Sequence, residues 1–199
     1  MRAAVIGSAL SLAVLGAPFG MAASAAAPPD RLAATVYVAR MSAERTWQHA
    51  VRDPFGSDYV DVFLLVGALS YRYASRFEDG LLLEAEGQLA RHFGDQHHWE
   101  INAMPVVARW RRFPWSGKVD TSAAFGLGLS FATRVPEVEV ELEGVSRRLL
   151  VYWMAEITAG PPRGRWAVCL RLHHRSDAWG LLGEDGGMNA LGLGIRFRF

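Results

Sequence analysis

The final ten residues, 190–199, alternate between large apolar side chains and small or charged ones. The apolar face carries Leu191, Leu193, Ile195, Phe197 and Phe199. The opposite face carries Ala190, Gly192, Gly194, Arg196 and Arg198. A period of two predicts a β-strand, because successive side chains of a strand point to opposite sides of the sheet. A strand with one apolar face and one small or charged face is typical of a membrane barrel whose outer wall contacts lipid.

About eight segments, this one included, have strand-like patterns and are separated by turn-like or charged stretches. They comprise residues 33–40, 59–73, 81–92, 99–113, 121–133, 147–159, 165–176 and 188–199. None of them shows sustained helical spacing. The sequence therefore predicts an all-β fold, an eight-stranded antiparallel transmembrane β-barrel that forms one domain over residues 26–199.

Alternation alone does not say which face lies inside, because a soluble barrel such as a lipocalin would bury its apolar rows. Three features favour the membrane: Phe199 closes an alternating strand, Gly and Ala are frequent on the non-apolar face, and tryptophans stand near segment ends. The tryptophans are Trp47, Trp99, Trp110, Trp115, Trp153, Trp166 and Trp179. On this assignment several charged residues point into the barrel, where ionised groups must be paired. They are Glu84, Glu86, Glu156, Arg171, Arg175, Arg196 and Arg198.

The N-terminal region has the pattern of an export signal. Arg2 precedes an uncharged stretch over residues 3–29, which contains the small-residue run 22–27. This pattern predicts a secretory signal peptide over residues 1–25, with an uncleaved membrane anchor as the alternative. Both interpretations place the protein outside the cytoplasm.

The composition argues against disulfide-bonded, cysteine-metal and nucleic-acid-binding proteins. A single cysteine, Cys169, excludes an internal disulfide and a cysteine-based metal cluster, and its parity predicts that it fills space inside the barrel. A formal net charge of +1 without a basic run gives no support for nucleic-acid binding.

Three polar residues interrupt the apolar face of the last two segments: His174, Ser176 and Asn189. With both termini periplasmic, the connection over residues 177–187 is extracellular, so the three side chains lie near the outer leaflet and point into lipid. An imidazole can take the proton of a nearby hydroxyl, and a third group can fix its tautomer. The alternative is an interfacial polar pair where the strand leaves the bilayer. All three side chains are expected on the outward face, which favours a functional site over an interfacial pair, because polar groups that face hydrocarbon are costly.

Residues 171–178, which read Arg-Leu-His-His-Arg-Ser-Asp-Ala, are followed by a loop of about ten residues and by Gly-Met-Asn at 187–189. Together with the aromatic-ended last strand, this pattern resembles the C-terminal signature of the outer-membrane lipid A 3-O-deacylases, the PagL family, often labelled acyloxyacyl hydrolases. Before the last two strands the resemblance is only architectural. It implies an eight-stranded barrel with a Ser-His site on its outside wall that cleaves an acyl ester on the lipid A glucosamine. By that likeness Ser176 is the nucleophile and His174 the general base, whereas His173 points to the interior.

Two positions depart from the family pattern. Asp177 stands where the family usually has Asn, and Asn189 stands where a well-studied type of member has Glu. Asparagine can orient an imidazole but brings no charge to stabilise the imidazolium. Asn189 is the expected orienting residue.

The loop after residue 176 supplies the remaining predicted groups. Glu184 or Asp185 is the alternative acid, and Asp177 is expected to turn toward solvent. The backbone amides of Ala178 and Gly180 are candidate oxyanion donors.

The sequence thus predicts an outer-membrane serine esterase that needs neither metal nor cofactor, with lipid A of lipopolysaccharide as substrate and outer-membrane lipid as surroundings. Two alternatives are a non-catalytic structural or adhesive barrel and a phospholipase-type esterase that uses the same residues. Homodimer formation and acyl-chain preference stay open.

Overall fold

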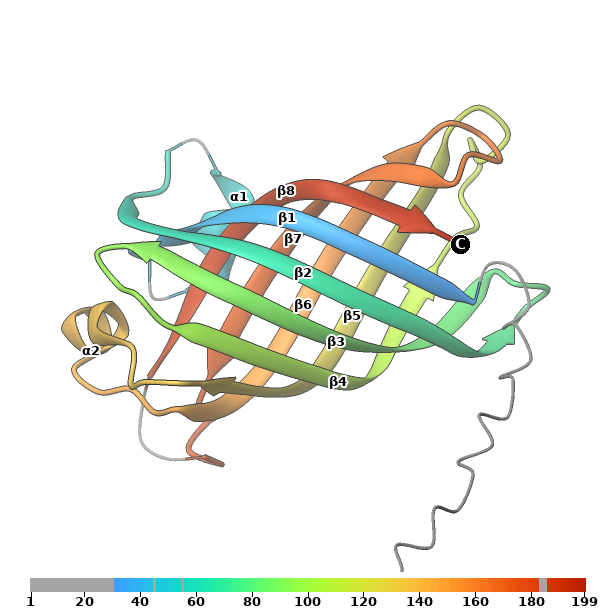
Figure 1. Ribbon diagram of the computed structural model, residues 1–199. Coiled ribbons are helices and arrows are strands. Elements are labelled where there is room, and N and C mark those ends of the chain that lie inside the picture. The colour runs from blue at the N-terminus through green and yellow to red at the C-terminus, as the bar shows by residue number, and fades with distance from the viewer. Residues whose placement is uncertain (1–30, 45, 55, 183–185) are drawn as a thin grey trace, which may run out of the picture.

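The computed structural model describes residues 31–44, 46–54, 56–182 and 186–199, so the predicted signal peptide lies outside the described residues. Eight strands form one closed antiparallel barrel, in which each strand pairs with its sequence neighbours and β8 returns to β1 (Figure 1). Their bounds are β1 Leu32–Ser42, β2 Tyr59–Arg76, β3 Leu81–Gly94, β4 Trp99–Trp110, β5 Asp120–Ala132, β6 Leu149–Gly160, β7 Trp166–Ser176 and β8 Gly187–Arg198. The predicted fold class is confirmed.

The strands place apolar side chains outside and polar ones inside. On β8, Leu193 and Ile195 are 62% and 56% exposed, whereas Arg196 is 5% exposed. The same alternation runs along β2, β3 and β6. An apolar exterior around a polar interior is the arrangement of a transmembrane barrel and the inverse of a lipocalin.

Charged residues form a paired cluster in the middle of the lumen. Arg171 lies 2.6 Å from both Glu86 and Glu156, and Arg109 lies 2.8 Å from Glu156. Arg196 binds Glu84 at 2.9 Å. These contacts confirm the predicted inward direction of the charged residues and satisfy the requirement that buried ions be paired.

Tyrosine, glutamine and histidine side chains form the adjoining layer. Tyr37 and Tyr152 contact Nδ1 of His173 at 2.9 and 3.1 Å, and its Nε2 contacts Glu100 at 2.8 Å. His173 is therefore an interior residue, as expected. Small inward residues make room for this layer: a Cβ atom at Gly192 would lie 2.7 Å from Cδ2 of Tyr37.

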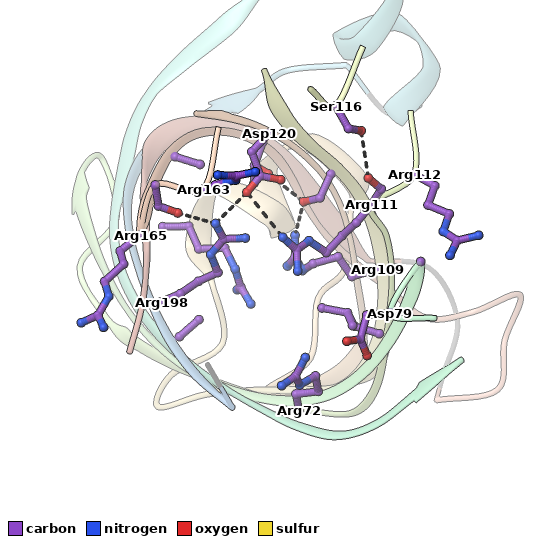
Figure 2. A pocket seen from close by; sticks show the side chains of 18 of the residues that line it. Arg72, Asp79, Arg109, Arg111, Arg112, Ser116, Asp120, Arg163, Arg165 and Arg198 are labelled. Carbon is purple, nitrogen blue, oxygen red and sulfur yellow. Dashed lines mark hydrogen bonds and ion pairs between the residues drawn. The ribbon is translucent and has the colours of Figure 1, made fainter. Parts of the chain in front are cut away.

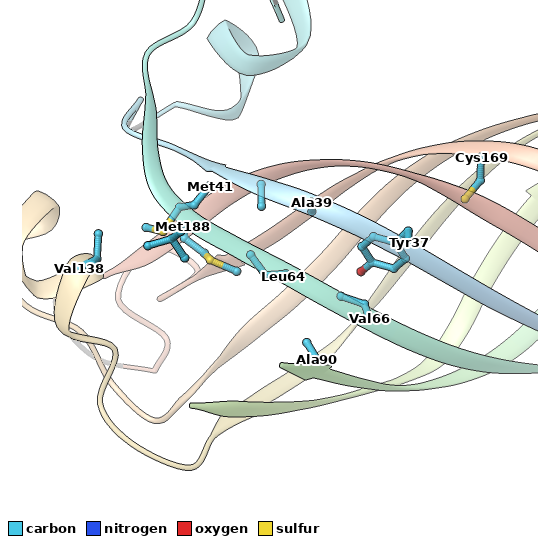
Figure 3. Close-up of a cluster of buried hydrophobic side chains, with 11 residues drawn as sticks. Tyr37, Ala39, Met41, Leu64, Val66, Ala90, Val138, Cys169 and Met188 are labelled. Carbon is cyan, nitrogen blue, oxygen red and sulfur yellow. The ribbon is translucent and has the colours of Figure 1, made fainter. Parts of the chain in front are cut away.

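An apolar cluster lies inside the barrel at the end next to α2, beside the buried polar side chains of Gln96 and His92. Met41, Leu64 and Met188 pack there with Val138, and the same cluster extends along the interior to the buried Cys169 (Figure 3). Cys169 is thus a buried interior residue, as its parity predicted.

Two short helices, α1 Trp47–Arg52 and α2 Glu137–Glu143, lie in the connections at the end of the barrel opposite the C-terminus (Figure 1). The sequence analysis missed both. A stretch of six or seven residues is too short to show helical periodicity, and the Glu-Val alternation of α2 has the period of a strand. Among the described residues, no helix is both long and apolar enough to cross a membrane.

Candidate active site on the outer wall

Strands β6, β7 and β8 bring the polar residues of the outer wall together. In the register of the sheet, His174 on β7 lies between Trp153 on β6 and Asn189 on β8. Ser176 follows two residues later on the same face of β7. His173 and Arg175, which alternate with this pair, are fully buried in the lumen. The structure thus places all three residues on the outside of the barrel.

His174 and Asn189 are joined by a hydrogen bond whose direction follows from the surrounding groups. Nδ2 of Asn189 donates to the backbone carbonyl of Glu44 at 3.0 Å, so Oδ1 is the amide atom that faces the imidazole, 2.7 Å from Nδ1 of His174. Because an amide oxygen only accepts hydrogen bonds, Nδ1 carries the proton. The neutral ring then presents an unprotonated Nε2, which is the state that a general base requires.

One aromatic ring packs against the imidazole, and two further rings pack against that one. The ring of Trp153 lies 4.5 Å from that of His174, and Trp47 of α1 meets Trp153 edge-on at 5.5 Å. The ring centroid of Phe125 lies 5.7 Å from that of Trp153. His174 is half-buried as a result, while Asn189 is 2% exposed. The base therefore lies in an apolar niche beside α1.

Ser176 is half-buried at the end of β7, opposite Val151 and Gly187. Within the described part of the chain, no hydrogen bond joins its hydroxyl to His174. Residues two apart in a strand are separated by about 6.6 Å along the backbone, so a rotation of the two side chains controls whether they meet. In catalytic sites without substrate, such contacts are often loose.

The turn after Ser176 is held by Asp177. Ala178, Trp179 and Gly180 have φ values of 54°, 57° and 86°, and the amide of Gly180 donates to the Asp177 carboxylate at 2.5 Å. In this conformation the Gly180 amide is already engaged, which leaves Ala178 as the candidate oxyanion donor of the two. The Asp177 carboxylate therefore stabilises the turn by accepting this hydrogen bond.

Glu184 and Asp185, the alternative acids, lie outside the described residues. Two contributions were missed by the sequence analysis: the Glu44 carbonyl, which fixes Asn189, and the packing of Trp47 through α1. Both come from the long connection between β1 and β2, where the sequence has no periodic signal.

One cluster in the lumen has the composition of a metal site. Ligand atoms of His92, His98 and Glu100 lie within 4.8 Å of one another. However, the Gln96 carbonyl accepts from the Val138 amide, so its NH₂ group faces Nδ1 of His92 at 3.1 Å. His92 then carries its proton on Nε2 and donates it to Glu100 at 3.0 Å. With this nitrogen protonated, the cluster is a hydrogen-bond network rather than a ligand set.

Comparison with known proteins supports the fold. No protein-family model matches the chain, and no curated protein matches it. Among solved structures, the chain is similar to the crystal structure of the outer membrane enzyme PagL, with a TM-score of 0.58 and 14% sequence identity. The match covers 84% of this chain and 99% of that chain. At this identity the likeness establishes a shared barrel architecture.

Proposed function

We propose that this protein is a serine esterase of the outer membrane that removes the 3-O-linked acyl chain from lipid A. The observation that carries the proposal is the 2.7 Å hydrogen bond between His174 and Asn189 on the lipid-facing wall, with Ser176 on the same face of β7. Polar side chains in contact with hydrocarbon are costly and mark function in membrane proteins. A fold shared with an outer membrane enzyme adds support.

The proposed reaction uses the three residues in distinct roles. Ser176 Oγ attacks the ester carbonyl while Nε2 of His174 removes the hydroxyl proton. The resulting imidazolium passes that proton to the sugar oxygen that leaves, and the acyl chain stays on Ser176. Water, deprotonated by the same imidazole, then releases the fatty acid. Asn189 holds the ring throughout but leaves its positive charge unneutralised.

The position of the site suits a lipid substrate. A molecule already dissolved in the outer leaflet can reach the wall by lateral diffusion, so the ester need not leave the membrane. The niche beside Trp153 and α1 limits water around the imidazole.

Mass spectrometry of lipid A from cells that express the protein tests this proposal. We expect the wild type to remove one hydroxyacyl chain and Ser176→Ala to lower the rate at least about 10³-fold. Ser75→Ala is the matched control, since Ser75 is also half-buried but lies on β2 at the other end of the barrel. An unchanged lipid A mass with the wild type, or full activity of Ser176→Ala, would refute the assignment.

Two further measurements separate the alternatives. Equal release of fatty acid from phospholipid vesicles and from lipopolysaccharide would indicate a phospholipase-type esterase. A serine-reactive lipid phosphonate that labels no residue would indicate a structural or adhesive barrel, whereas labelling mapped to Ser176 supports the esterase.

A further inference from the structure

A cavity of about 1000 Å³ opens at one end of the barrel (Figure 2). This end carries the C-terminus (Figure 1). Its walls are the ends of the strands and the turns over residues 77–80, 111–119 and 161–165. Its floor contains Glu84, Arg109 and Arg196 of the central ion-pair cluster. We call this cavity the arginine vestibule. It lies at the opposite end from α1 and the candidate active site.

Charge in the arginine vestibule is unbalanced. Nine arginines and four carboxylate residues are among the described residues that line it. Asp120 is shared between Arg198 at 2.6 Å and Arg111 at 3.4 Å. A single carboxylate therefore faces two guanidinium groups at the mouth.

Several guanidinium groups lack a carboxylate partner. Among the described residues, neither Arg72 nor Arg163 has a side-chain hydrogen bond or ion pair. Figure 2 shows Arg72 across the opening from Asp120, Arg111 and Arg198. Cationic side chains thus face the cavity from opposite walls.

Two buried guanidinium nitrogens beside the vestibule also lack an acceptor among the described residues. Nη2 of Arg109 and Nε of Arg111 are inaccessible to solvent and have no acceptor in the described part of the chain. Arg109 is only 3% exposed. Unsatisfied donors are destabilising, but water does not reach these two atoms, so a ligand would contact them only after the side chains rotate. The direct partners of an anion in the vestibule are the accessible guanidinium groups, such as those of Arg72 and Arg163.

We propose that the arginine vestibule binds a phosphate-bearing anion with more than one negative charge. Guanidinium groups recognise phosphate through paired hydrogen bonds, and several of them around one cavity fit a ligand with several anionic oxygens. A volume of about 1000 Å³ admits a ligand larger than a single phosphate ion. The ligand is either a soluble oligophosphate or the phosphate headgroup of a lipid in the adjacent leaflet. The proposal is independent of the esterase activity.

Isothermal titration of the purified full barrel with inorganic pyrophosphate tests this site. We expect saturable binding by the wild type and at least tenfold weaker binding by the double variant Arg72→Gln/Arg163→Gln. The two side chains have no partner in the described structure, so the substitution preserves the fold. The control Arg134→Gln removes one positive charge at an exposed position on the opposite end of the barrel. This variant should bind pyrophosphate like the wild type.

Nanodiscs separate the two sources of phosphate. Pyrophosphate affinity that is the same in phosphatidylcholine discs and in discs with added cardiolipin supports a soluble ligand. Affinity that falls with cardiolipin in the wild type but not in the double variant supports a lipid headgroup. Absence of saturable binding at millimolar pyrophosphate, or equal weakening by Arg134→Gln, would overturn the proposal.

Discussion

Polar side chains in the interior of this barrel have several polar partners, whereas those on the outer wall have few. In the central cluster of the lumen, Arg171 is held by two carboxylates at 2.6 Å. On the wall, His174 has one polar partner, and the Ser176 hydroxyl has none among the described residues. Interior polarity is explained by the requirement to pair charges in a narrow barrel. The wall has no such requirement, so its polar residues need a different explanation, and the proposed esterase reaction provides one.

Removal of a central charge is the strongest test of the interior. Arg171→Met leaves Glu86 and Glu156 without their shared guanidinium, and we expect a loss of about 3–5 kcal/mol in the free energy of unfolding. Urea unfolding in detergent micelles measures it. The control Arg134→Met changes an exposed arginine and should alter stability by less than about 0.5 kcal/mol. Equal stability of the two variants would show that the central cluster does not hold the barrel together.

Removal of the His174 imidazole from the outer wall should lower activity strongly and change stability little, the opposite of the effect expected at Arg171. His174→Ala should lower the rate of acyl release about 10³-fold and leave the free energy of unfolding within about 1 kcal/mol of the wild type. The exposed His97, in the connection between β3 and β4, supplies the matched control His97→Ala. A large loss of stability with unchanged activity would assign His174 to structure and remove the contrast between the two regions.

The pH dependence of stability is a smaller test of the interior, at His98 in the connection between β3 and β4. Burial, with a contribution from neighbouring His92, lowers the pKa of His98 from 6.5 to about 3. Below pH 6.5 the unfolded chain binds a proton that the folded chain excludes until the pH nears 3. The free energy of unfolding should therefore fall as the pH decreases through this window, by up to about 1.4 kcal/mol per pH unit, and should not depend on His98 above it.

Stability measured from pH 7 to pH 4 checks this effect. His98→Phe removes the titrating group and keeps a ring to stack on His92, whose ring centroid lies 4.0 Å from that of His98. Its stability should depend less steeply on pH than that of the wild type or of His97→Phe. Parallel pH profiles for all three proteins would contradict the prediction.

Alternation in the sequence predicted the strands and which residues share a face, whereas Phe199, the small residues of the non-apolar face and the tryptophans indicated which face lies outside. Once the apolar face was assigned to the outside, parity predicted the outward placement of His174, Ser176 and Asn189 and the inward placement of His173. A period-two pattern carries this information locally, so no knowledge of the neighbouring strands is needed.

Partners across the barrel could not be predicted in the same way. Arg171 and Glu86 are 85 residues apart, and their contact depends on the register of every strand between them. The Glu44 carbonyl that fixes Asn189 belongs to a connection without periodicity. Local pattern thus locates the candidate site on the wall, whereas its fine positioning comes from segments that the pattern does not describe.

The ion pairs at the floor of the arginine vestibule also determine what this barrel cannot do. Glu84, Arg109 and Arg196 close the cavity from below, and Arg171 with its two carboxylates fills the layer beyond them. A hydrated ion that enters from the C-terminal end therefore meets, among the described residues, two successive layers of paired side chains. Reconstituted in a planar bilayer, the protein should be electrically silent.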